Sequence, residues 1–156
     1  MKIKQAVKVF WTLSTMFWAT VAFANSDNVG VGLIVGEPTG LSLKAWQDST
    51  HAIDVGLGWT AEHNESFHVH ADYLFHDFSV FKPSTGRMPL YYGVGGAISR
   101  KSGDDTHVGI RVPFGISYLL ENSPLEIFGE IAPRADFSTN SHLIVDAALG
   151  IRFYFK

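Results

Sequence analysis

The stretch LIVDAALGIRFYF, residues 143–155, decides the fold of this chain. Every odd-numbered position from 145 to 155 is apolar, whereas the even-numbered positions from 146 to 152 carry Asp, Ala, Gly and Arg. Successive side chains of a β-strand point to opposite faces, so the stretch has one bulky apolar face and one face of small and charged residues. Alternation of this kind predicts a β-strand, and it recurs after residue 25 without helical periodicity of useful length.

Turn-forming residues interrupt the alternation at seven places and so divide the chain into eight predicted strands. Most of these strands are close to the 9–11 residues that a tilted strand needs to cross a bilayer. The count is even and every connection is short, which is typical of a closed antiparallel barrel. The predicted strands are 28–36, 40–47, 51–60, 66–76, 89–99, 107–119, 125–135 and 143–155.

The two faces of these strands decide the class of barrel. A soluble, lipocalin-like barrel would enclose the bulky apolar face and leave an outer surface of glycine and scattered charges, which forms sheet poorly. The reverse arrangement places an apolar band against lipid and fills a narrow eight-stranded interior with small and charged side chains. We therefore predict an all-β, eight-stranded antiparallel up-and-down transmembrane β-barrel. The predicted interior charges are Lys44, Asp54, Asp72, Arg111, Glu126, Glu130, Arg134, Asp146 and Arg152.

Length and composition narrow the function classes. The chain has 156 residues, which allows one domain. The absence of cysteine excludes a disulfide scaffold, thiolate metal sites and a cysteine nucleophile. The formal net charge of −3 disfavours nucleic-acid binding, which needs a basic face.

The first residues have the pattern of a signal peptide. Three lysines precede an apolar stretch, and Ala22-Phe23-Ala24 fits the small-x-small cleavage rule. The polar residues from 25 to 27 end the apolar run before the roughly 20 residues of a membrane anchor. We predict a signal peptide over 1–24 and a barrel over 25–156, whose net charge becomes −6 because three of the 12 basic residues and no acidic one are removed.

The end of the chain resembles a known targeting signature. Gly150, Phe153 and Phe155 match the C-terminal pattern of bacterial outer-membrane β-barrel proteins, although Ala148 stands at a usually polar position and Lys156 follows the last aromatic residue. The resemblance implies that the barrel assembly machinery reads this strand. The chain as a whole resembles small barrels of the outer-membrane protein A and X type, and residues 36–42 and 111–116 resemble an uncharacterised family of such barrels, a likeness that implies location and fold but no activity.

Aromatic residues and prolines refine this prediction. If both termini lie in the periplasm, Tyr73, Phe75, Tyr92, Tyr118, Phe153 and Phe155 fall at the periplasmic rim, whereas Trp59 and Phe67 fall near the opposite rim. Two prolines within predicted strands, Pro113 and Pro133, cannot donate to a ladder and are predicted to mark bulges or strand ends. The connection 77–88 is the longest on the periplasmic side and is predicted to contact a partner or pack under the barrel.

The interior charges require partners, because desolvating an ion costs several kcal/mol. A last hairpin with its tip near residues 139 and 140 places Arg134 opposite Asp146 and Arg152 diagonally near Glu126 and Glu130. The network is predicted to plug the barrel. A gate, in which a carboxylate exchanges arginine partners, is the alternative.

Two histidines and a carboxylate share one face of a strand at His68, His70 and Asp72, and Asp54 is the plausible further ligand. Such a set is a weak candidate for zinc or copper, while titratable members of a polar core are the preferred interpretation, so no metal and no cofactor are predicted. The remaining histidines, at 51, 63, 76, 107 and 142, fall in or near turns and are predicted to be solvated.

Lipid A deacylases and palmitoyltransferases use eight-stranded barrels with a serine and a histidine, and the deacylases carry a His-x-Ser motif. No histidine of this chain has serine two positions later, and the adjacent Ser141 and His142 point to opposite faces of a strand. The glycine-rich segment 93–96 lies inside a strand with no following helix, so it is no phosphate-binding loop.

The sequence therefore predicts a monomeric, non-catalytic outer-membrane barrel with a structural or surface-interaction role. Its predicted partners are membrane lipid, lipopolysaccharide and the assembly machinery. A small gated channel and a lipid A-modifying enzyme stay open as alternatives.

Overall fold

The structure, a computed structural model, describes residues 28–60, 66–100, 106–137 and 142–155. These residues form one sheet of nine antiparallel strands. Within the described ranges no helix is long and apolar enough to cross a membrane. The strands are β1 (Val29–Glu37), β2 (Thr39–Trp46), β3 (His51–Thr60), β4 (Ser66–Phe81), β5 (Met88–Arg100), β6 (Thr106–Arg111), β7 (Phe114–Leu119), β8 (Leu125–Asp136) and β9 (His142–Tyr154).

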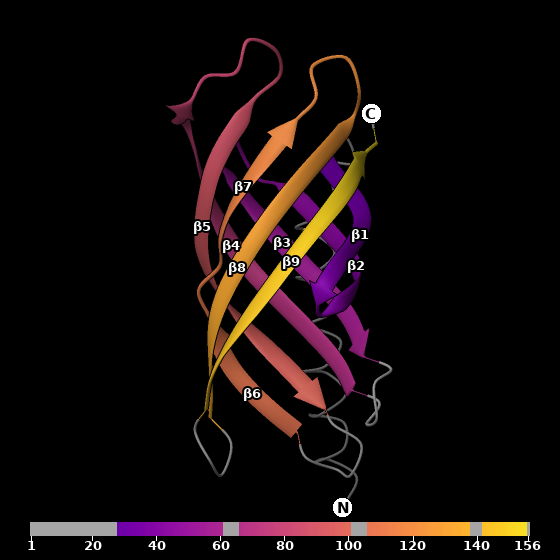
Figure 1. The fold of residues 1–156 in the computed structure, drawn as a ribbon, viewed down its shortest axis with the longest axis vertical. Helices are drawn as coiled ribbons and strands as arrows, with labels where there is room; N and C mark the ends of the chain where they lie inside the picture. Colours follow the sequence, from indigo (N-terminus) through magenta and orange to yellow (C-terminus); the bar gives the residue numbers. More distant parts are fainter. Residues whose placement is uncertain (1–27, 61–65, 101–105, 138–141, 156) are drawn as a thin grey trace, which may run out of the picture.

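The sheet closes into a ring because β1 pairs with both β2 and β9 (Figure 1). Both β6 and β7 pair with β5 on one side and β8 on the other, so they occupy a single position in the ring. The predicted eight-stranded antiparallel up-and-down barrel is thereby confirmed. We call the end where β1 begins and β9 ends the terminal end, and the opposite end the hairpin end.

The two prolines explain why one strand is divided. Pro113 separates β6 from β7, as predicted, and the interruption is bridged by a hydrogen bond from the Val112 N–H to the Pro133 carbonyl (2.9 Å). Pro133 was expected to mark a bulge or strand end but lies inside β8, opposite Val145. The N–H and the carbonyl of a residue in an antiparallel strand point to the same neighbour. The N–H that Pro133 lacks would therefore point toward the break between β6 and β7. Because the regular ladder is already interrupted there, β8 continues through Pro133.

Strand β4 is longer than the sequence predicted. It runs to Phe81 rather than ending at residue 76, and it pairs with β5 through an irregularity between Asp77 and Phe81. The Oδ1 atom of Asp77 accepts hydrogen bonds from the N–H (2.8 Å) and hydroxyl (2.6 Å) of Ser79 at this irregularity. The connection predicted over 77–88 is therefore partly strand.

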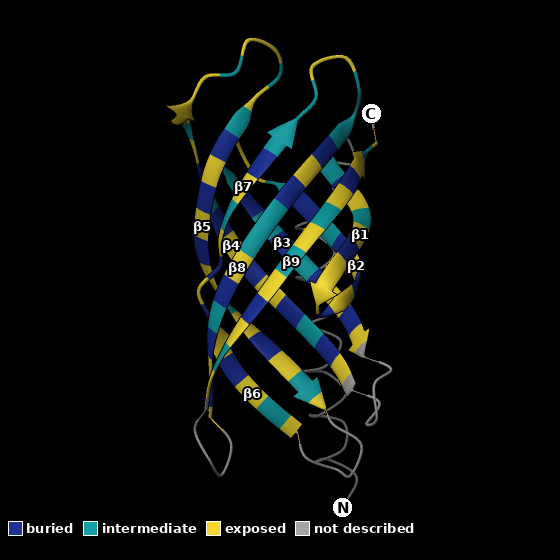
Figure 2. Cartoon of the chain, in the orientation of Figure 1, coloured by how far each residue is buried: buried dark blue, intermediate teal, exposed yellow. Residues whose placement is uncertain are grey.

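The bulky apolar residues are exposed on the outside of the barrel, as predicted. Figure 2 shows buried and exposed positions alternating along the strands. Leu149, near the middle of β9, is 69% exposed, and Val35 beside it on β1 is 68% exposed. The charged side chains of the other face are buried inside. A small apolar cluster, formed by Ile34, Leu74, Tyr91 and Phe128, accompanies them in the described interior, together with four buried alanines.

Glycines hold the wall close to the interior side chains. A Cβ atom at Gly95 would lie 2.0 Å from the Oδ1 of Asp72 and 2.2 Å from a backbone oxygen, whereas one at the adjacent Gly96 would meet nothing closer than 3.7 Å. We expect Gly95→Ala to lower the free energy of unfolding by about 1–3 kcal/mol through overpacking. Gly96→Ala, the matched control, is expected to stay within about 0.5 kcal/mol. Urea unfolding of the two refolded variants measures the difference, and equal stabilities would contradict this account of the wall.

Candidate functional site

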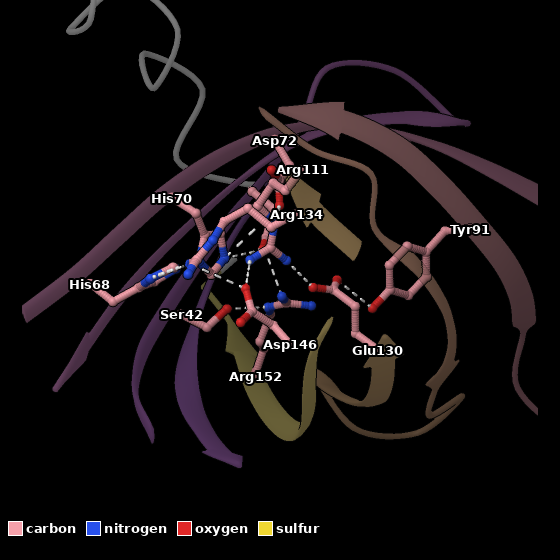
Figure 3. Close-up of polar contacts among 11 residues, drawn as sticks. Ser42, His68, His70, Asp72, Tyr91, Arg111, Glu130, Arg134, Asp146 and Arg152 are labelled. Carbon is pink, nitrogen blue, oxygen red and sulfur yellow. Dashed lines mark hydrogen bonds and ion pairs between the residues drawn. The ribbon is translucent and has the colours of Figure 1, made fainter. Parts of the chain in front are cut away.

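All nine predicted interior charges point into the barrel, where four cations and five carboxylates form two groups of ion pairs with His70 between them. Figure 3 shows part of this set, with Arg111, Arg134 and Arg152. Sequence reasoning missed a sixth carboxylate, Asp136, which is 4% exposed. It also missed the phenol groups of Tyr91 and Tyr154, which donate to interior carboxylates. Asp136 has the same parity as the predicted interior residues of its strand, and that signal could have found it.

Lys44 and Glu126 form the pair closest to the terminal end, with 2.8 Å between Nζ and Oε1, and both side chains are fully buried. The Lys44 ammonium lies 4.4 Å from the centroid of the Trp46 ring. Trp46 donates from Nε1 to the hydroxyl of Tyr154 (3.1 Å), which in turn donates to Glu126. Two aromatic side chains and one ion pair thus contact one another at the terminal end of the lumen.

Arg152 occupies the middle of the lumen. Its guanidinium lies 2.6 Å from Asp54 Oδ1 and 3.5 Å from Glu126 Oε2, donates from Nε to the Ser42 hydroxyl (2.7 Å), and lies 3.6 Å from the centroid of the Phe128 ring. The predicted contact with Glu126 is present, directly across the β8–β9 ladder rather than diagonally. The carboxylate nearest to Arg152 is that of Asp54 on β3, a pairing that the sequence did not indicate.

Arg111 joins three carboxylates above Arg152. Its Nε lies 3.0 Å from Asp72 Oδ2, Nη2 pairs with Glu130, and Nη1 lies 3.8 Å from Asp146 Oδ2. Glu130, predicted near Arg152, is held instead by Arg111 and by the hydroxyl of Tyr91 (3.0 Å). A cavity of about 10 Å³ remains beside this cluster, which leaves room for no more than one water molecule.

Arg134 lies nearest the hairpin end. The sequence prediction placed it opposite Asp146, but its ladder partner is Ile144, and Asp146 lies opposite Ala132. The register differs by two residues, a shift that keeps every inward side chain inward and that alternation therefore cannot detect. Arg134 still reaches Asp146 diagonally at 3.4 Å, and its Nε pairs with Asp136 at 2.8 Å.

Three of the four weak metal candidates lie together. The ligand atoms of Asp54, His70 and Asp72 are within 4.8 Å of one another, whereas His68 is displaced to the far side of His70. Both carboxylates already face arginines, Asp54 at 2.6 Å and Asp72 at 3.0 Å. In this arrangement the two carboxylates of the candidate metal site are ion-pair partners of Arg111 and Arg152.

The histidines predicted to be solvated have different environments. His76 is 5% exposed, with Nδ1 3.1 Å from the Thr50 carbonyl and its ring 4.3 Å from that of Trp46. That prediction was wrong, because β4 extends past residue 76 and His76 shares the inward parity of His68 and His70. His107 is half-buried in β6, His63 lies outside the described residues, and His142 belongs to β9.

His51 begins β3, directly after the β2–β3 turn, and its Nδ1 is 2.7 Å from Asp48 Oδ2. Asp48 also accepts hydrogen bonds from the backbone N–H groups of Thr50 and His51, both at 2.8 Å. These bonds, with that of Thr50 first, lower the pKa of Asp48 to about 2. The turn is therefore closed by an ionised carboxylate at any physiological pH.

Comparisons with known proteins agree on the fold alone. No protein-family model matches the chain, and no curated protein matches it. Among solved structures, the N-terminal β-barrel domain of Pseudomonas aeruginosa OprF matches 83% of this chain and 98% of its own, with a TM-score of 0.60 and 12% identity. The two barrels share one fold. The predicted resemblance to barrels of the outer-membrane protein A type is confirmed at that level, and the likeness of residues 36–42 and 111–116 to an uncharacterised family stays a prediction.

Proposed function

We propose that the chain is an integral outer-membrane protein, exported through residues 1–24, with a non-catalytic, structural or surface-interaction role. The observation that carries this proposal is the inverted distribution of side chains. Bulky apolar residues cover the outside of a closed sheet and buried ions fill its inside. A closed barrel satisfies its backbone groups internally, and an apolar outer band suits lipid rather than water. Lipid and lipopolysaccharide are then its immediate partners, and the barrel functions as a monomer.

The filled interior supports a plugged barrel rather than an open pore. Two groups of ion pairs occupy the interior, one from Lys44 to Asp54 and one from Asp72 to Asp136, and His70 lies between them. The cavity beside Arg111 holds no more than one water molecule. Planar-bilayer recordings are expected to show no steady conductance. Discrete conducting levels would favour the small gated channel instead.

The side chains inside the barrel also support a role without catalysis. Ser42 accepts a hydrogen bond from Arg152, and His68 and His70 contact each other, so these three side chains are engaged by interior polar groups. The buried Ser117 and His76 are not hydrogen-bonded to each other, so they form no nucleophile–base pair: His76 bonds the Thr50 carbonyl, and the Ser117 hydroxyl has no hydrogen-bond partner. Mass spectrometry of lipid A from deleting and overexpressing cells is expected to show an unchanged lipid. Loss or addition of an acyl chain would establish the enzyme alternative.

The experiment that tests the proposal is cell fractionation followed by electrophoresis with and without boiling. We expect the protein in the outer-membrane fraction, with a mobility that changes on heating because the closed barrel resists detergent until boiled. A soluble periplasmic protein whose mobility does not change would contradict the proposal. Its apolar face would then have to be covered by something other than lipid.

Deletion of the last four residues, 153–156, tests the proposed assembly signal formed by Gly150, Phe153 and Phe155. We expect the shortened chain to accumulate unassembled in the periplasm, because the assembly machinery no longer finds the terminal aromatic residues. The readout is the fraction of protein with heat-modifiable mobility in the outer membrane. Deletion of Lys156 alone is the control and is expected to leave assembly unchanged. Normal assembly of the four-residue deletion variant would contradict the assembly signal proposed for the last strand.

A further inference from the structure

Two interior imidazoles connect an arginine to a pair of carboxylates (Figure 3). Arg134 Nη1 lies 2.9 Å from Nδ1 of His68, and Nε2 of His68 lies 3.2 Å from Nδ1 of His70. Nε2 of His70 faces Asp54 at 3.9 Å and Asp72 at 4.0 Å. His68 is 6% exposed and His70 is 4% exposed, so the whole series is shielded from bulk water.

The arginine determines where each imidazole carries its proton. A guanidinium has only donors, so Nδ1 of His68 must accept from Arg134 and the proton of a neutral His68 must be on Nε2. That N–H donates to Nδ1 of His70, which places the proton of His70 on Nε2 as well. His70 therefore presents an N–H to Asp54 and Asp72. With one proton on each ring, all hydrogen bonds of the series run in one direction.

A proton added to either imidazole produces the same conflict. On His68 it occupies Nδ1, which then faces the guanidinium as a second donor at 2.9 Å. On His70 it occupies Nδ1 and turns Nε2 of His68 into an acceptor, so the proton of His68 moves to Nδ1 and again faces Arg134. The guanidinium keeps two partners without His68, since its Nε lies 2.8 Å from Asp136 and its Nη1 lies 3.4 Å from Asp146.

Charges of both signs surround the pair. Six carboxylates and four cations of the described chain line the interior, namely Asp54, Asp72, Glu126, Glu130, Asp136 and Asp146 against Lys44, Arg111, Arg134 and Arg152. His70 faces Asp54 of β3 and Asp72 of β4, with Glu130 of β8 and Asp146 of β9 within electrostatic reach. His68 is opposed by the cations Arg134 of β8 and Arg111 of β6.

We propose that His68 and His70 form a single proton-binding site, and that the proton they take up displaces the guanidinium of Arg134 toward Asp136 and Asp146. Acidification would therefore rearrange the ion pairs of Arg134 at the hairpin end of the lumen. The terminal end, with Lys44, Glu126 and Arg152, stays in place. This inference depends on the interior geometry and not on where the barrel resides in the cell.

Nitrogen NMR of the full-length barrel, labelled with ¹⁵N-histidine and ¹⁵N-arginine and refolded in detergent micelles, tests the site directly. At pH 8 we expect His68 and His70 to carry their proton on Nε2. His76 is an internal control with the opposite tautomer, because its Nδ1 donates to the Thr50 carbonyl. On acidification, His68, His70 and the guanidinium nitrogens of Arg134 are expected to change with one shared midpoint. A proton on Nδ1 of His68 at pH 8, or separate midpoints for the pair, would overturn the proposal.

Substitutions distinguish protonation of the His68–His70 pair from protonation of other groups in the lumen. In Arg134→Gln the amide can turn its oxygen toward His68, so the conflict disappears and we expect the pair to bind a proton at least tenfold more tightly. Arg87→Gln changes an exposed arginine and is expected to leave the midpoint where it is. If Arg134→Gln does not fold, His68→Gln retains an acceptor for Arg134 and a donor for His70, and it should abolish the response of Arg134 to acid. An unchanged midpoint in Arg134→Gln, or an unchanged arginine response in His68→Gln, would refute the mechanism.

Addition of zinc tests independently whether Nε2 of His70 carries a proton. The proposal expects no loss of the Nε2 proton of His70 at pH 8 when one equivalent of zinc chloride is added, because that nitrogen presents a proton rather than a lone pair. Stoichiometric displacement of this proton by zinc would mean that Asp54, His70 and Asp72 form a metal site. The inferred direction of the hydrogen bonds from Arg134 through His68 to His70 would then be wrong.

Discussion

Replacing Arg152 by methionine is expected to lower the free energy of unfolding by about 3–5 kcal/mol, because it leaves buried carboxylates without their partner. Arg152 is 1% exposed and pairs with Asp54 at 2.6 Å and Glu126 at 3.5 Å. Methionine retains an unbranched apolar side chain at this position but removes the guanidinium from its carboxylate partners and from the face of the Phe128 ring. Urea unfolding in micelles, followed by tryptophan fluorescence, measures the effect.

The double variant Arg152→Met with Asp54→Asn identifies the cause of that loss. Neutralising Asp54 removes the uncompensated charge, while Glu126 keeps Lys44 at 2.8 Å. We expect the double variant to be more stable than the sum of the single losses by about 0.5–3 kcal/mol, the range for directly interacting residues. Additive losses would show that the two side chains do not stabilise each other.

Leu149→Arg is expected to cost about 2–4 kcal/mol and to impair insertion, because it places a cation on the lipid-facing surface near the bilayer midplane. Leu149 is 69% exposed and is flanked in the ladder by Val35 and Gly129. The stability of the variant is measured by urea unfolding from lipid vesicles, and insertion by the heat-modifiable fraction in cells.

Leu143→Arg is the matched control for this substitution. Leu143 lies on the same face of β9, six residues toward the hairpin end, and is 77% exposed. Near the interface the cost of arginine falls to about 0–1 kcal/mol. Equal effects of the two substitutions would contradict the proposed depth of the barrel in the membrane, and a negligible effect of both would contradict its membrane location.

The strand pattern could be predicted because it depends on residues close together in the chain. Alternation and turn residues located every strand of the ring, within a few residues at most ends. The exception was the extension of β4 to Phe81, where polar His76 and Asp77 conceal the continuing inward and outward parity. The same parity would have placed His76 and Asp136 inside.

The partners of the interior ions could not be predicted in the same way. Register was wrong by two residues in the last hairpin, since a shift of two leaves both faces unchanged. Arg152 meets Asp54 across the lumen rather than on a neighbouring strand, as Lys44 meets Glu126. Such contacts depend on the closure of the whole ring, which brings residues 98 and 82 positions apart within hydrogen-bond distance.

The amino-acid sequence by itself determined that this chain forms an antiparallel barrel with an apolar outside and a charged inside, because period-two alternation is a local property of each strand. The tertiary structure alone decided which ions pair and in which direction the hydrogen bonds of Arg134, His68 and His70 run. A narrow lumen brings side chains from opposite walls together, and only the closed ring specifies which ones meet.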